Sequence, residues 1–416
     1  MEAPNFGASF FLNTGQMKTT TQTLPLIKAS SRTDAVQEYY FSHKLREIEQ
    51  MRRAGADIIN LGIGSPDLPP SADTVFTLTK GASNPKNHAY QSYQGIGELR
   101  EAFAGWYKRY FNVELDPGSE ILPLMGSKEG IMHISMAFIN PGDEVLVPDP
   151  GYPTYSSATK LSGGVVRNYS LTKEGEWYPN IKELEESDLS RVKIMWINYP
   201  HMPTGQKATV KLFEELVAFA RRHSILLCND NPYSFILNKD HLSLLSIDGA
   251  KEVALELNSL SKSHNMSGWR VGMIAGHSAY IKDIIKIKSN MDSGMFKPLQ
   301  LAAADALSSG DEWYESLNRV YGKRAIIAGR IMEQLGCRYD KGQCGLFLWG
   351  EIPHYYHNAQ ELTEYLLHNA SLFITPGFIF GTNGQRYIRI SLCASEEILE
   401  SALERVRRSH KVKNVI

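Results

Sequence analysis

The sequence has no excess of one charge and no long apolar run. Its 44 lysines and arginines balance 45 aspartates and glutamates, so it offers no polycationic surface for nucleic acid or anionic lipid. No apolar stretch approaches the roughly 20 residues that span a bilayer, and residues 1–16 lack the basic start of a signal peptide. We therefore expect a soluble, cytoplasmic protein whose partners are small molecules or a second copy of itself.

Cysteine is also scarce. The four cysteines are Cys228, Cys337, Cys344 and Cys393, and none of them forms a pair with the spacing of metal ligands. Their apolar surroundings predict reduced, buried thiols. We expect no metal site.

Short apolar runs alternate with amphipathic stretches over much of the chain. The runs at residues 144–147, 193–197, 225–228 and 253–257 have the length and composition of buried strands. This alternation predicts an α/β fold whose mostly parallel sheet carries helices on both faces. Such sheets bind ligands at the carboxyl ends of their strands.

The two ends of the chain differ from this middle part. Helical spacing over residues 32–53 predicts one helix, and residues 299–335 predict a long helical region before two strands and a final helix. A chain of this length exceeds one small core. We expect a disordered tail at 1–23, in which Met17 is a second candidate start, an N-terminal segment at 24–64 that joins the small domain, a large ligand-binding domain at 65–296 and a small C-terminal domain at 297–416.

Lys262 is the first candidate for chemistry. It ends residues 259–262 (Ser-Leu-Ser-Lys), directly after a predicted buried strand, and Arg270 follows eight positions later. Burial and a neighbouring cation both lower the pKa of an amine, which supplies the neutral form that attacks an aldehyde. Taken alone, the segment also fits a solvated loop lysine.

Asp230 and Tyr233 follow the strand predicted at residues 225–228. A carboxylate at the carboxyl end of the sheet can keep a pyridine nitrogen protonated, which makes the ring an electron sink for a carbanion. Tyr233 can donate a hydrogen bond to a phenolate oxygen of the same ring. The segment 229–233 (Asn-Asp-Asn-Pro-Tyr) is also a good turn former, so a plain turn is the alternative.

Two further segments suit a phosphate and an aromatic ring. Residues 126–130 (Gly-Ser-Lys-Glu-Gly) open a helical stretch, and the free N–H groups of such an end bind phosphate. An ordinary N-cap role for Ser127 is the alternative. Residues 148–152 (Pro-Asp-Pro-Gly-Tyr) bring Tyr152 to the same sheet edge, where it can stack on a planar cofactor; alone, they are only a rigid turn.

Arg389 lies in a predicted strand at residues 385–391. The strand alternates and is half-buried, and a guanidinium there suits a substrate carboxylate, which it grips through two parallel hydrogen bonds. We expect the neighbouring Arg386 to be solvated.

Together and in this order, these segments resemble the class I/II aminotransferases of pyridoxal 5'-phosphate (PLP) fold type I. The resemblance begins at residues 60–67 (Asn-Leu-Gly-Ile-Gly-Ser-Pro-Asp) and runs to the final helix. It implies a mostly parallel seven-stranded sheet between helices and a smaller α+β domain. It also implies PLP as the cofactor and a ping-pong transfer of an amino group from an L-amino acid to a 2-oxo acid, with 2-oxoglutarate and glutamate as the shared pair.

The resemblance also implies a role for each candidate residue. Lys262 would form the Schiff base and shuttle the proton of the substrate Cα. Asp230 would pair with the pyridinium nitrogen and Tyr233 with the O3′ oxygen. Arg389 would bind the substrate α-carboxylate, and Gly64 would leave room beside it. The other cofactor contacts would be stacking by Tyr152 and phosphate binding by Ser127, Lys128 (chiefly through main-chain N–H), Ser259 and Arg270.

Residues 90–95 (Tyr-Gln-Ser-Tyr-Gln-Gly) resemble the family segment whose first tyrosine reaches the phosphate of the neighbouring subunit. Tyr90 therefore implies a homodimer with shared active sites. A monomer would then be inactive.

The chain departs from the family pattern at residues 198–205 (Asn-Tyr-Pro-His-Met-Pro-Thr-Gly). Met202 stands where the family has an asparagine, so an amide donor to O3′ is missing. This loss should raise the pKa of the Schiff base unless His201, Asn198 or Tyr233 compensates.

Residues 90–95, 126–130 and 289–296 look like the subgroup that contains the LL-diaminopimelate aminotransferases, which suggests a substrate with a distal polar or charged end. A carbon–sulfur β-lyase or another eliminating enzyme is the alternative within the fold type. A non-catalytic PLP-binding sensor is less favoured, because Lys262, Asp230, Arg270 and Arg389 all persist.

Overall fold

The computed structural model describes residues 26–413 apart from residues 37 and 39, with side chains as far as residue 409. The predicted tail at 1–23 and Met17 lie outside the described residues. Among the helices that are described, none is long and apolar enough to cross a membrane.

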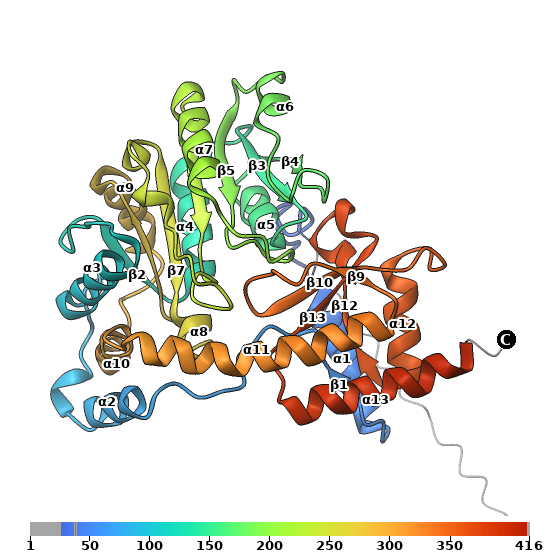
Figure 1. The fold of residues 1–416 in the computed structure, drawn as a ribbon. Coiled ribbons are helices and arrows are strands. Elements are labelled where there is room, and N and C mark those ends of the chain that lie inside the picture. The colour runs from blue at the N-terminus through green and yellow to red at the C-terminus, as the bar shows by residue number, and fades with distance from the viewer. Residues whose placement is uncertain (1–25, 37, 39, 414–416) are drawn as a thin grey trace, which may run out of the picture.

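A seven-stranded sheet forms the larger half of the molecule (Figure 1). The strand order is β2-β8-β7-β6-β5-β3-β4, and all neighbours are parallel except β8, which is antiparallel to β2 and β7. The mostly parallel sheet expected from the sequence is confirmed. Its strands are β2 (Ile121–Leu124), β3 (Glu144–Asp149), β4 (Val165–Ser170), β5 (Val192–Ile197), β6 (Leu226–Asp230), β7 (Ala254–Ser259) and β8 (Gly272–Gly276).

Helices cover both faces of this sheet, and its inner strands are therefore apolar on both sides. In β5, Ile194 and Trp196 pack against α4, α5 and α9, whereas Met195 and Ile197 pack into the core shared with α3 and α7. The helices of this part are α2 (Ala72–Ala82), α3 (Gly97–Phe111), α4 (Ser127–Phe138), α5 (Pro153–Leu161), α6 (Ile181–Glu185), α7 (Val210–His223), α8 (Leu260–Ser263) and α9 (Ser278–Lys288).

The second sheet is antiparallel and has the order β12-β13-β10-β9. The N-terminal segment lies beside it (Figure 1): β1 pairs in parallel with β11 through Ile59 and Leu372, and Ile48 of α1 packs on Phe373. The elements are α1 (Tyr40–Arg53), β1 (Ile59–Asn60), β9 (Arg338–Tyr339), β10 (Phe347–Glu351), α12 (Ala359–Ala370), β11 (Leu372–Phe373), β12 (Thr375–Pro376), β13 (Tyr387–Ser391) and α13 (Glu396–Lys413).

Two helices differ from the prediction. The long helical region is divided into α10 (Lys297–Leu307) and α11 (Asp311–Gln334). Ser308 caps α10 through its backbone N–H, and Gly310, whose backbone is extended, caps the start of α11. α11 then runs from the large sheet to the small one (Figure 1). The first helix begins at Tyr40 and not at residue 32, since Thr33 forms a turn by donating its hydroxyl to the Ser30 carbonyl at 2.8 Å.

Polar contacts at Asp149 and at Asp67 are among those that join the part of the chain around the large sheet to the C-terminal part. Asp149, at the end of β3, accepts hydrogen bonds from the Thr382 N–H (3.1 Å), the Thr382 hydroxyl (2.5 Å) and the Asn383 N–H (3.0 Å). Arg324 of α11 donates two bonds to the Asp67 carboxylate, at 2.6 and 2.8 Å. These contacts fix the position of one sheet relative to the other.

Candidate active site

A cavity of about 360 Å³ lies at the carboxyl ends of β6 and β7 and reaches β13 of the small sheet. Every site residue predicted from the sequence lines it except Tyr90. The predicted members of its wall are Gly64, Ser127, Lys128, Tyr152, Asp230, Tyr233, Ser259, Lys262, Arg270 and Arg389. The fold therefore gathers residues that lie more than 300 positions apart in the sequence.

Lys262 stands at the wall of this cavity on the short helix α8, which Ser259 caps by accepting the Ser261 N–H at 3.1 Å. Its Nζ donates to the Gly64 carbonyl oxygen. Desolvation by the surrounding protein lowers the pKa of the amine, and Arg389 and Arg270 lower it further. The arrangement favours the neutral amine that attack on an aldehyde requires.

Asp230 ends β6 and is buried. Its Oδ2 accepts a hydrogen bond from the Tyr155 hydroxyl at 3.0 Å, whereas its Oδ1 is buried without a partner among the described residues. Burial raises the pKa of the carboxyl to about 6. A buried acceptor oxygen on a cavity wall fits a ligand that brings an N–H donor, such as a protonated pyridine.

The start of α4 forms an anion cradle with Arg270. Gly126 is the N-cap residue at φ 85°, and a side chain there would place its Cβ 2.0 Å from an Nη of Arg270. The alternative of Ser127 as the N-cap is therefore wrong: it is the first helical residue, and the cap makes no side-chain bond. Ser127 and Lys128 in the first turn of α4, the Arg270 guanidinium and Ser259 all line the cavity, and a helix start beside a guanidinium suits a phosphate.

Arg389 is buried in β13 with its guanidinium 3.8 Å from the ring centroid of Phe347. It donates to the Gly62 carbonyl at 2.9 Å and contacts the sulfur of Met202 at 3.2 Å. The space at Gly64 is occupied by the Phe347 ring, since a Cβ there would lie 2.2 Å from that ring. Gly64 thus makes room for the aromatic support of Arg389, which the sequence did not indicate.

Arg386 was predicted to be solvated, and the structure shows otherwise. Its guanidinium is half-buried and donates to four backbone carbonyls, because the loop before α12 turns its oxygens toward it. The acceptors are the carbonyls of Tyr356, His357 (3.2 Å), Ile352 (3.1 Å) and Pro353 (2.8 Å).

Met202 lies on the cavity wall beside Asn198. The Asn198 side chain accepts the Met202 N–H at 2.8 Å and donates one amide hydrogen to the Asp230 carbonyl, which leaves its second amide hydrogen for another acceptor. His201 is buried away from the cavity and contacts the Thr204 hydroxyl at 2.8 Å. Of the three residues that could replace the missing amide donor, only Tyr233 and Asn198 reach the cavity.

Tyr90 does not line the cavity, and 91% of its surface is exposed. Sequence reasoning also missed residues that do line it. Tyr155, the partner of Asp230, stacks on Trp196 with a centroid distance of 5.0 Å. Its only signal was its position, one helical turn after Tyr152.

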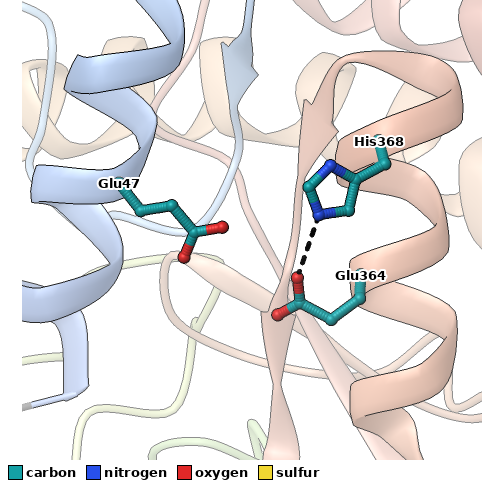
Figure 2. Close-up of side chains that lie close together, drawn as sticks. All are labelled: Glu47, Glu364 and His368. Atoms are coloured by element: carbon teal, nitrogen blue, oxygen red, sulfur yellow. Dashed lines mark ion pairs between the residues drawn. The ribbon is translucent and has the colours of Figure 1, made fainter.

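Two groups of acidic and histidine side chains among the described residues have the spacing of metal ligands. Figure 2 shows the first, Glu47 of α1 with Glu364 and His368 of α12. The Lys44 ammonium lies 2.8 Å from Glu47 and 2.7 Å from Glu364, and a protein cation already balances the two carboxylates. The second group, Glu129, His133 and Asp292, is also accompanied by a buried lysine.

The site and the fold together define a class of enzyme. The carboxyl edge of the mostly parallel sheet carries three features: a lysine amine with a lowered pKa, an aspartate oxygen with no donor among the described residues, and a phosphate cradle. These features define a PLP-dependent enzyme of fold type I. The residues present fit the cofactor, in particular the Oδ1 of Asp230, for which the described part of the chain offers no partner.

Comparison with known proteins gives the family. Residues 56–406 match the model for aminotransferase class I and II. The chain is 41% identical over 372 residues to an LL-diaminopimelate aminotransferase of Moorella thermoacetica, which covers 89% of this chain and 95% of that protein. It is 38% identical over 382 residues to one of Dehalococcoides mccartyi, covering 91% and 98%. The chain belongs to the class I and II aminotransferases and is a PLP-dependent transferase.

Solved structures agree. The apo form of BacF from Bacillus subtilis superimposes with a TM-score of 0.88 at 34% identity, covering 92% of this chain and 98% of that one. An aspartate aminotransferase of Thermus thermophilus gives a TM-score of 0.86 at 25% identity, covering 92% and 100%. The small-molecule substrates of the family are amino acids and keto acids.

Proposed function

We propose that this aminotransferase uses Lys262, Asp230, Tyr233 and Arg389 to move an amino group from an L-amino acid to a 2-oxo acid, with glutamate and 2-oxoglutarate as one pair. PLP, when bound, withdraws electrons from the substrate Cα and weakens its C–H bond. The observation that carries this assignment is the buried Oδ1 of Asp230, which has no partner among the described residues and lies in the cavity that also holds Lys262.

Each of these residues has a separate task in the proposal. Lys262, with its lowered amine pKa, would take the proton from the Cα of the amino acid and, in the second half-reaction, deliver a proton to the Cα of the 2-oxo acid. Asp230 accepts the N–H of the ring nitrogen, and Tyr233 donates to the ring oxygen. Arg389 binds the α-carboxylate with the N–H groups of its fork, and Phe347 holds it in the required plane.

The remaining cofactor contacts follow from the anion cradle. Ser127, Lys128, Ser259 and Arg270 would hold the phosphate, and Tyr152 would stack on the ring. Tyr152 lines the cavity and lies edge-on to Tyr155 with a centroid distance of 5.6 Å, an orientation that leaves a ring face for a planar ligand.

A homodimer with shared active sites is part of this proposal. The exposed Tyr90 side chain supports it, since a hydroxyl directed outward can serve a neighbouring subunit. We also propose the division into a segment at 24–64, a large domain at 65–296 and a small domain at 297–416, and a cytoplasmic location.

For the donor we propose an L-amino acid with a distal polar or charged end, because the curated relatives are LL-diaminopimelate aminotransferases. The test is the visible spectrum of the PLP-loaded protein with LL-diaminopimelate, L-glutamate or L-alanine and no acceptor. Bleaching by the first two, and return of the band with 2-oxoglutarate, is expected. Bleaching by L-alanine alone would overturn the donor class, and release of pyruvate and ammonia without an acceptor would indicate a β-lyase.

A further inference from the structure

The helix end assigned to the phosphate carries a negative charge of its own. Glu129 lies in the first turn of α4, two residues after Ser127, and its Oε2 accepts the Met125 N–H at 2.6 Å. A carboxylate at this position stabilises the helix. It also repels any second anion that binds at the same end.

Lys288 of α9 supplies the opposite charge. Its side chain is only 1% exposed, and its Nζ lies 3.6 Å from Glu129 Oε1 and forms an ion pair with the Asp292 carboxylate. The His133 ring nitrogen contacts the same Glu129 oxygen at 2.6 Å. Lys288 thus stands between two carboxylates that have little access to water.

Asp292 connects Lys288 to the segment that contains Tyr90. Its second oxygen accepts the Gly294 N–H at 2.7 Å. Gly294 has φ 83°, and a Cβ there would lie 2.6 Å from the Gln91 carbonyl and 2.9 Å from that of Ser92. The turn that Asp292 holds is therefore packed directly on residues 91 and 92.

We propose that Lys288 is a positioning residue for the cofactor phosphate: it neutralises Glu129 at the start of α4 and, through Asp292, fixes the backbone beside Tyr90. This inference rests on the proposed phosphate site at residues 126–128. Removing one partner of a buried ion pair leaves an uncompensated charge. In Lys288→Met the carboxylates left are Asp292 and Glu129, and Glu129 lies at the helix end that carries the proposed phosphate site.

The experiment compares the affinities of the apoenzyme for PLP and for pyridoxal, which lacks the phosphate, by titration of the visible band. In Lys288→Met, PLP affinity should fall at least about tenfold while pyridoxal affinity stays within about twofold, because the lost charge acts on the phosphate. In Glu129→Gln/Lys288→Met, PLP affinity should return to within about threefold of wild type. Glu129→Gln alone should raise the PLP-to-pyridoxal ratio.

The matched control is Lys44→Met, which removes another buried lysine and should change neither affinity. Lys44 lies between Glu47 and Glu364, the two glutamates drawn in Figure 2. Equal weakening of PLP and pyridoxal in Lys288→Met, or no rise of the ratio in Glu129→Gln, would overturn the proposal. Should Lys288→Met not fold, Glu129→Gln alone decides it. Arg270→Met tests the phosphate site separately from the role of Lys288, because unchanged PLP affinity in this variant would refute the phosphate site itself.

Discussion

Asp230 is a site residue whose ionised form is unfavourable in the cofactor-free protein. Its carboxyl is buried, one oxygen has no partner among the described residues, and its pKa is raised to about 6. A folded-state pKa above the unfolded value means that the folded protein binds the proton more tightly. The carboxylate therefore destabilises the cofactor-free protein as pH rises from about 4 through 6.

We predict that Asp230→Asn stabilises the cofactor-free protein at pH 7.5 by roughly 3 kcal/mol, the equivalent of moving a pKa from 3.8 to about 6. The amide oxygen can still accept from Tyr155. Urea unfolding of both proteins at pH 7.5 and at pH 4 measures the effect. The difference should fall to about 0.5 kcal/mol at pH 4, close to the unfolded-state pKa, and an equal difference at both values would contradict the assignment. Transamination should be lost at either pH.

We predict that Met202→Asn lowers, by about one unit, the pH at which the visible band of the PLP-loaded enzyme changes, because the amide restores a donor to the ring oxygen. A pH titration of the absorption spectrum measures this midpoint. Met202→Leu, which adds no donor, is the control and should leave it in place. An unchanged midpoint in Met202→Asn would mean that Tyr233 or Asn198 already provides the bond.

At the residue scale, the sequence predicted the polar wall of the cavity well. Lys262 and Asp230 each follow an apolar strand, and a parallel sheet brings such positions to one edge. It missed Phe347 and Tyr155, whose contacts depend on how the two sheets face each other. The prediction for Arg386 was wrong because the carbonyls that surround it come from a loop some 30 residues away.

The start of α4 is the element on which cofactor binding depends most. The helix can approach Arg270 closely only because residue 126 has no side chain. The positive φ of Gly126 adds a backbone requirement that other residues meet at a cost.

We predict that Gly126→Ala weakens PLP binding at least about tenfold, since displacement of Arg270 removes a charge-assisted contact to the phosphate. Reconstitution of the apoenzyme with increasing PLP measures it. Gly105→Ala is the matched control: that glycine is in the middle of α3 with no atom within 4 Å of the added Cβ, so it should stabilise the protein by about 0.5–1 kcal/mol and leave PLP binding intact. Equal PLP affinity in both variants would contradict the role of Gly126.

At the element scale, strands were easier to predict than helix ends. Buried runs such as residues 193–197 are unambiguous, because both faces of the sheet are covered. The break between α10 and α11 lies at Gly310, whose backbone is extended, and helical periodicity alone does not reveal it. The pairing of β1 with β11 joins residues more than 300 positions apart and has no local signal.

For the whole molecule, the proposed shared site gives a complementation test. Lys262→Ala and Tyr90→Phe subunits should each be defective alone. When unfolded together and refolded in equal amounts, half of the dimers are hybrids with one intact site of two, so about a quarter of wild-type activity should appear. A size tag on one subunit detects the hybrids. If hybrids form and no activity appears, a role of Tyr90 across the interface is contradicted.

The contact at Asp149 and the contact at Asp67, both between the two sheets, should respond differently to salt. Asp149 is held by neutral donors from Thr382 and Asn383, near Tyr152 of the site, whereas the Asp67–Arg324 pair near Ser65 is ionic and its Asp67 side chain is 32% exposed. Salt screens the second contact more than the first. Rising ionic strength should therefore loosen the contact at Asp67 while the contact at Asp149 holds, so the junction between the two sheets responds to salt on one side only. Amide hydrogen exchange would record it as faster exchange at residues 65–70 with no change at 377–384, and equal acceleration of both segments would exclude it.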